Sequence, residues 1–341
     1  MKRLMKWGLG LVVLGAIGWF AWWSLLAVGQ ETAISTWFEE RREAGWQAEH
    51  GAIDVQGFPF RLDRRISDIA LADPRTGWAW ALPVVSVEGA AQTPTRIRVS
   101  LPEAHRLAVP GERVDITHET LAASLALRPE PALPLLDAKA EGRAIRLESQ
   151  SGWTAEAEIL GVQVTERAPE TGPANAYDLL VDAQGVDLPK PIIEAIDPTG
   201  LLEPKLDALR IEGHGAFRAP LDRHALEDGR LALAAATVKT ARLTWGELSV
   251  EATGSFQVDR AGFPEGKVKL RLRNWRQMIK VARDSGAVSR DVLDAIEEAL
   301  EFVALLAGGG DTLDVPLRLS GGKVRIGPVA VADAPRVAPP L

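Results

Sequence analysis

The sequence predicts a mainly β protein with a few helices. The expected architecture is an N-terminal transmembrane helix followed by an extended, curled antiparallel sheet, groove-like or sandwich-like, with a C-terminal helical insertion. An uncharged run covers residues 7–28, and apolar residues alternate with polar ones along many later segments. The 22 prolines and 31 glycines favour frequent turns over a helical bundle.

The first element is a membrane anchor at residues 7–28, behind a basic cytoplasmic leader at residues 1–6. These 22 uncharged residues, at about 1.5 Å per helical residue, reach roughly 33 Å and exceed a bilayer core of about 30 Å. By the positive-inside rule, the remainder of the chain is exported. A cleavable signal peptide is the alternative, because Ala27 and Gly29 are small residues at a plausible cleavage spacing.

Tryptophans mark this anchor. Trp7 opens the uncharged run, and Trp19, Trp22 and Trp23 gather near its exported end. Amphipathic rings favour the headgroup level of a bilayer. The four tryptophans are therefore the predicted membrane-anchor residues.

Residues 29–50 are predicted to contain an amphipathic connecting helix. Ile34, Trp37, Phe38 and Arg41 share one helical face, and Gly45 is suited to end the helix.

A β-rich domain is expected over residues 51–332. Its period-2 alternation is clear at 97–101, 145–148, 209–212, 268–273 and 313–319. This pattern is typical of half-buried antiparallel strands with one apolar and one wet face. Residues 333–341, which include three prolines, are predicted to form a flexible tail.

Helices are expected near 189–196, 275–283 and 289–307. The last has Ser289 as a suitable N-cap, a stripe of apolar residues, and three glycines after it. Such helices would cover one apolar face or an open end of the sheet.

Composition excludes several function classes. The net charge of −7 becomes −10 when the three basic residues of the leader are left out, and such a domain repels a phosphate backbone. We therefore expect no nucleic-acid partner. The absence of cysteine excludes disulfides, thiolate metal sites and cysteine nucleophiles.

Motifs for chemistry are sparse, and we predict no enzyme activity, no catalytic residue, no cofactor and no metal. No phosphate-binding loop or nucleophile elbow is present in the sequence. His214 and His224, with Asp222 and Asp228, are a conceivable metal site, but surface or turn histidines are the simpler interpretation. Trp245 fits either a core position or a binding platform.

Strands with one apolar and one polar face are compatible with two shapes of the sheet. The sheet closes on itself as a sandwich, or it curls into a groove whose lining stays apolar. A groove of this kind could hold acyl chains without any catalytic residue, because each buried methylene contributes about 0.8 kcal/mol.

The chain resembles an uncharacterised domain family of alphaproteobacterial single-anchor envelope proteins. The motifs that carry this are Gly57-Phe58-Pro59-Phe60-Arg61, Trp78-Ala79-Trp80 and the closing segment 317–328. The chain is more distantly similar to AsmA-like and TamB-like inner-membrane proteins. That resemblance implies a bacterial inner-membrane protein whose main domain, a curled sheet with a hydrophobic groove, lies in the periplasm. The positive-inside rule places the N-terminus in the cytoplasm. Phe58, Pro59 and Phe60 of the first motif are predicted groove or strand residues.

Three functions follow as hypotheses. The first is a non-enzymatic protein for lipid handling or outer-membrane maintenance, with the lipid bilayer and a phospholipid or other acyl-chain ligand as partners. The second is a structural adaptor that binds another envelope protein through a sheet edge or the helix at 289–307. The third is a hydrolase with a non-local active site.

Overall fold

A computed structural model describes residues 2–168, 173–227, 231–306, 308–327 and 329–338, without the side chains of residues 2–13, 226, 227 and 329. The chain divides into two compact units. Unit 1 comprises residues 1–126 and 149–151, and unit 2 comprises residues 127–148 and 152–341.

Unit 1 combines a long helix with antiparallel strands. Its elements are α1 (Lys2–Glu43), β1 (Gln47–Glu49), β2 (Ile53–Gln56), β3 (Asp63–Asp73), β4 (Trp78–Ala90), β5 (Thr93–Ser100), β6 (Ala104–Val109), β7 (Glu112–Thr117) and β8 (Thr120–Leu127, whose last residue belongs to unit 2). Strands β1, β2 and β4 pair with β3, and the other edge of β4 pairs with β5 and β6. Phe38 of α1 packs into the core of this sheet with Ile66, Ile69 and Leu82.

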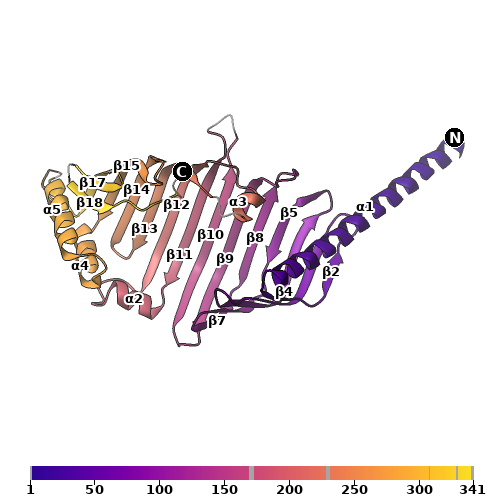
Figure 1. Cartoon of the computed structure of the whole chain (residues 1–341), viewed down its shortest axis with the longest axis horizontal. Helices are drawn as coiled ribbons and strands as arrows, with labels where there is room; N and C mark the ends of the chain where they lie inside the picture. Colours follow the sequence, from indigo (N-terminus) through magenta and orange to yellow (C-terminus); the bar gives the residue numbers. More distant parts are fainter. Residues whose placement is uncertain (1, 169–172, 228–230, 307, 328, 339–341) are drawn as a thin grey trace. The chain divides into compact units, whose positions relative to one another are not determined.

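The N-terminal region is one continuous helix of 42 residues, and its first part extends beyond the sheet (Figure 1). Residues 29–43 are therefore helical, as predicted, but they continue α1 and do not form a separate connecting helix. A single helical glycine costs only about 1 kcal/mol, so Gly29 does not break α1, and the Thr32 hydroxyl bonds the Val28 carbonyl at 2.9 Å. The predicted stop is confirmed, because Gly45 has a φ of +87° just after the helix.

The predicted transmembrane character of residues 7–28 is not confirmed, although the helix itself is present. Among the residues described with side chains, which begin at Leu14 in α1, no helix is long and apolar enough to cross a membrane.

A buried pair of histidines lies in unit 1. The rings of His105 and His118 are 5.4 Å apart, and Trp80 lies 5.8 Å from His105. Both histidines are buried, and neither ring nitrogen of His118 has a hydrogen-bond partner. Burial lowers the pKa of both imidazoles.

This pair predicts a pH dependence for the stability of unit 1. Histidines in the unfolded chain titrate near pH 6.5, whereas the folded unit resists their protonation. The free energy of unfolding is therefore highest above about pH 6.5 and falls as the pH is lowered through it. Urea unfolding at pH 7.5 and pH 5 should show this loss, and His118→Phe should reduce it. An equal loss in the variant would contradict the assignment.

Unit 2 is built from long strands with helical insertions. Its elements are β9 (Leu135–Ser149, whose last residue belongs to unit 1), β10 (Thr154–Glu166), β11 (Ala176–Asp187), α2 (Lys190–Ile196), β12 (Lys205–Phe217), α3 (Arg223–Glu227), β13 (Leu233–Trp245), β14 (Leu248–Val258), β15 (Pro264–Arg273), α4 (Trp275–Ser285), α5 (Arg290–Leu306), β16 (Thr312–Ser320), β17 (Lys323–Ile326) and β18 (Val329–Asp333). Helices α2, α4 and α5 lie in the three stretches where helices were expected.

The strands of unit 2 form a meander in which each strand pairs antiparallel with the next, from β9 to β18. Figure 1 shows this order from β9 to β15. The antiparallel, mainly β prediction is therefore confirmed. The described strands of this unit pair into one continuous sheet.

The core of unit 2 lies where α4 and α5 cover β16 to β18. Trp275 and Ile279 of α4 and Leu300 of α5 pack against the strands. The strand residues beneath them include Leu313 and Val315, both almost fully buried. This covering role is the one expected for the C-terminal helices.

Residues 334–338 are not a loose tail, which corrects that part of the prediction for 333–341. Ala334 and Ala338 are buried, and the Val337 amide bonds the Gly262 carbonyl at 2.9 Å. Residues 339–341 lie outside the described part of the chain.

Candidate functional site

The sheet of unit 2 has one continuous apolar face. Because directly paired residues of neighbouring strands point to the same face, the strand registers define rows across the sheet. One row consists of Leu160, Ala183, Leu209, Leu243, Val250, Leu272 and Leu313. The next consists of Val162, Val181, Ile211, Ala241, Ala252, Leu270 and Val315. We call this surface, from β10 to β16, the apolar face.

The opposite face is charged and internally paired. Arg242 bonds Glu251 at 2.9 Å, and Arg271 bonds Asp314 at 2.9 Å. Hydrogen bonds from Arg271 and Lys269 lower the pKa of Asp314 to about 2. The two faces therefore differ sharply in chemistry, as the period-2 alternation predicts.

Helices cover only part of the apolar face. At β16 the side chains lie beneath α5, whereas Leu160 and Val162 of β10 and Leu179 of β11 are exposed. Large contiguous apolar surfaces that stay exposed mark binding sites in soluble domains.

A cavity of about 490 Å³ lies where α2 and α4 stand over β13 and β14. Its floor includes Leu243 and Val250 of the row described above. The lining is almost entirely apolar and consists of Ala195, Ile196, Leu202, Leu243, Trp245, Leu248, Ser249, Val250, Met278, Val281, Ala282, Ser285 and Ala287. Ligand sites typically enclose about 300–1,000 Å³ with mainly hydrophobic walls, so we call this space the roofed pocket.

Polar groups beside the roofed pocket hold its wall together. The carboxylate of Asp197, which is buried, accepts a 2.6 Å hydrogen bond from the Leu202 amide. The Thr199 hydroxyl bonds Asp284 of α4 at 3.0 Å, and the Gln277 amide of α4 bonds the Leu201 carbonyl at 2.9 Å. These bonds fasten the segment after α2 to α4.

Two polar side chains at the pocket are bonded to protein partners. The Trp245 indole N–H donates to the Glu203 carbonyl at 2.7 Å, and the Ser285 hydroxyl donates to the Ala282 carbonyl at 2.9 Å. The pocket therefore suits a hydrocarbon chain, whose burial contributes about 0.8 kcal/mol per methylene.

The structure offers no support for the conceivable metal site. His214 lies on β12 and His224 on α3, while Asp228 is outside the described residues. No group of three or more metal-ligating side chains occurs among the residues that are described.

The predicted groove motif Phe58-Pro59-Phe60 belongs to unit 1 and lies against α1. The Trp19 indole donates to the Pro59 carbonyl at 2.7 Å, and the Trp23 indole donates to the Arg61 carbonyl at 2.7 Å. Phe58 stacks edge-on against Phe20 and Trp23, each at 5.5 Å. The structure thus brings two of the predicted anchor tryptophans, Trp19 and Trp23, into contact with the predicted groove motif.

The other two predicted anchor residues are Trp22 and Trp7. Trp22 is exposed, and Trp7 lies outside the residues whose side chains are described.

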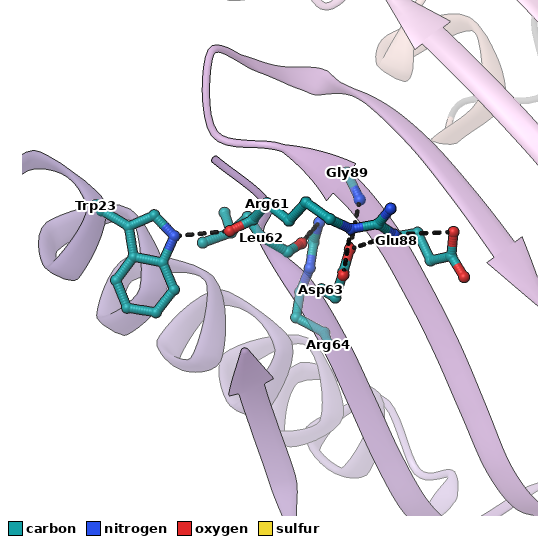
Figure 2. A network of polar contacts seen from close by, with 7 residues as sticks. All are labelled: Trp23, Arg61, Leu62, Asp63, Arg64, Glu88 and Gly89. Atoms are coloured by element: carbon teal, nitrogen blue, oxygen red, sulfur yellow. Dashed lines mark hydrogen bonds and ion pairs between the residues drawn. The ribbon is translucent and has the colours of Figure 1, made fainter. Parts of the chain in front are cut away.

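Charged residues fix the segment after the motif, as Figure 2 shows. Arg61 bonds Asp63 at 2.6 Å and Glu88 at 3.2 Å. The hydrogen bond to Asp63 is the main cause of a raised pKa for Arg61, which therefore remains protonated. The Gly89 amide also donates to Asp63 at 3.3 Å, joining β4 to the network.

The sequence does not predict the roofed pocket. Its residues come from α2, β13, β14 and α4, and no local pattern shows that these elements meet. The signals in the sequence are the helix periodicity at 275–283 and Trp245, which fits either a core position or a binding platform.

A model of the bacterial family described as "Uncharacterized protein conserved in bacteria (DUF2125)" matches residues 23–335. No curated protein and no solved structure matches the chain. The expected likeness to an uncharacterised domain family is confirmed, whereas the resemblance to AsmA-like proteins is not shown by these matches.

Proposed function

The chain belongs to the DUF2125 family, and from that premise we propose that it is a non-enzymatic, membrane-anchored envelope protein that binds lipid acyl chains. The observation that carries this proposal is the apolar face of unit 2 with its roofed pocket of about 490 Å³. Outer-membrane maintenance is the cellular role that such binding would serve in a bacterial envelope.

The apolar lining of the roofed pocket indicates the class of ligand. Its walls offer hydrocarbon contact along α4, β13 and β14, and the indole of Trp245 is already engaged. A polar ligand would lose hydrogen bonds to water on entering, whereas an acyl chain loses none. The exposed part of the apolar face on β10 and β11 would curl around further methylenes of the same ligand class.

The proposal also includes a membrane anchor and an orientation of the chain across the inner membrane. Residues 7–28 of α1 would hold the protein in the inner membrane, with residues 1–6 in the cytoplasm and the two units in the periplasm. The basic leader and the uncharged run support this orientation.

Filling the roofed pocket tests the binding site. Ala282 of α4 lines the pocket, so Ala282→Trp should occupy the ligand volume and weaken binding of a dansyl-labelled fatty acid by about tenfold, or about 1.4 kcal/mol. Lys280→Trp on the exposed side of α4 is the matched control and should bind normally. Titration of the full chain, held in an amphipathic polymer, gives both affinities. Equal binding by both variants would exclude the pocket.

An adaptor role has one specific observation in its favour. Phe302, Leu305 and Leu306 near the end of α5 are all exposed, and such groups favour a partner surface. A photoreactive residue at Leu305 should then give one discrete protein adduct in cells. Adducts to lipid alone, or to none, would count against the adaptor.

A further inference from the structure

We infer that the loop Gly57–Arg61 is a second membrane contact, seated in the bilayer interface beside α1. We call this loop the aromatic foot. It differs from the lipid-binding face because it belongs to unit 1. The inference rests on the proposed anchoring of α1 and not on acyl-chain binding in unit 2.

The aromatic foot exposes large apolar rings beside an exposed apolar helix. Phe58 is 49% exposed, Phe60 is 64% exposed, and Phe20 of α1 is 57% exposed. Leu14 and Ile17, further toward the N-terminus of α1, are also exposed. The rings therefore continue the uncharged surface of α1 rather than form an isolated patch.

Four backbone carbonyls of the aromatic foot accept hydrogen bonds from within the protein. The Pro59 and Arg61 carbonyls accept hydrogen bonds from the two indoles of α1. The Gly57 carbonyl accepts from the Arg61 amide at 2.8 Å, and the Phe60 carbonyl accepts from the Ala91 amide at 2.9 Å. An unsatisfied backbone group in hydrocarbon costs several kcal/mol, so the bonds to these four carbonyls lower the cost of insertion.

Gly57 makes this conformation accessible. Its φ is +103°, and a Cβ placed there would lie 2.6 Å from the Cβ of Arg61. Only glycine satisfies both conditions, so the tight return of the loop onto α1 depends on this residue.

The pairing of Arg61 indicates whether the aromatic foot prefers anionic or zwitterionic lipid. Arg61 is the cation nearest the rings along the chain, and its guanidinium is bonded to the carboxylates of Asp63 and Glu88. Because this cation is already paired, the foot should be attracted by apolar contact and not by anionic headgroups. We therefore expect zwitterionic phosphatidylcholine to suffice.

The chain has no cysteine, so single cysteines can carry a spin label without a background. In the full chain reconstituted into phosphatidylcholine vesicles, labels at Ile17→Cys and Phe60→Cys should both be accessible to oxygen and shielded from a water-soluble nickel complex. A label at Glu119→Cys, an exposed turn position of unit 1, should be open to nickel. Adding Phe58→Ser to the Phe60→Cys chain should raise nickel accessibility several-fold.

The two labels separate failure of the foot from failure of the anchor. A shielded label at residue 17 with a water-exposed label at residue 60 would overturn the aromatic foot and leave the anchor intact. If both labels were open to nickel, the anchor and the foot would fail together. Shielding at residue 60 only with anionic lipid would contradict the paired-charge argument.

Discussion

Replacing Trp275 with alanine is expected to lower the free energy of unfolding of unit 2 by about 3–5 kcal/mol. Trp275 is 1% exposed and joins α4 to Leu300 of α5 and to Leu313 and Val315 of β16. Its removal leaves a cavity where helices and sheet meet. Hydrogen exchange read by mass spectrometry should show amides of α4 and α5 opening first, because these helices lose their main contact with the strands.

A phenylalanine at position 275 is the matched control. The Trp275 indole nitrogen is buried without a hydrogen-bond partner, so Trp275→Phe breaks no hydrogen bond and keeps an aromatic ring in the core. It should cost less than half as much as the alanine variant. A loss below about 1 kcal/mol for Trp275→Ala would contradict the assignment of this cluster as the core.

Placing a carboxylate on the apolar face should abolish acyl-chain binding. Val250 of β14 lines the roofed pocket and belongs to the apolar row between Leu243 and Leu272. In Val250→Asp, a bound chain would have to desolvate the new charge, and we expect at least a hundredfold loss of affinity, or about 2.7 kcal/mol. Binding of the dansyl-labelled fatty acid, measured as for Ala282→Trp, gives the value.

Ser255→Asp provides the control for this charge. Ser255 is on the same strand, on the opposite face, where its paired neighbour is Lys267. A carboxylate at position 255 therefore lies on the charged face beside Lys267. The affinity for the dansyl-labelled fatty acid should remain unchanged. Comparable losses in both variants would show that net charge, and not the apolar face, governs the interaction.

The sequence predicted the chemistry of the strands well because the relevant pattern is local. Alternation at 268–273 and 313–319 indicated which side chains share a face, and the registers of β15 and β16 place Leu270 against Val315 accordingly. Helix periodicity also located α4 and α5, since the apolar stripe needed to cover a sheet is visible within one segment.

These local patterns could not predict contacts between residues that are far apart in the sequence. The roofed pocket depends on α2 meeting α4, through bonds such as that from Gln277 to the Leu201 carbonyl, 76 residues apart. The contact of Trp19 with Pro59 spans 40 residues. Neither spacing follows from periodicity, because pairing along a meander does not specify which inserted segments fold back together.

The predicted break between the anchor and the connecting helix is absent from α1 for a different reason. A change from an uncharged run to an amphipathic stretch alters the surroundings of a helix without altering its backbone. With no proline in residues 2–43, the hydrogen-bond ladder of α1 continues through Gly29.

The most direct test of acyl-chain binding is photo-crosslinking with a phosphatidylcholine that carries a diazirine in its acyl chain. The full chain in nanodiscs containing this lipid is irradiated, and the modified peptides are mapped by mass spectrometry. We predict adducts on β13, β14 and α4, at the walls of the roofed pocket, in addition to those on α1, and their loss in Val250→Asp. Adducts confined to α1 and the aromatic foot would contradict lipid binding by unit 2.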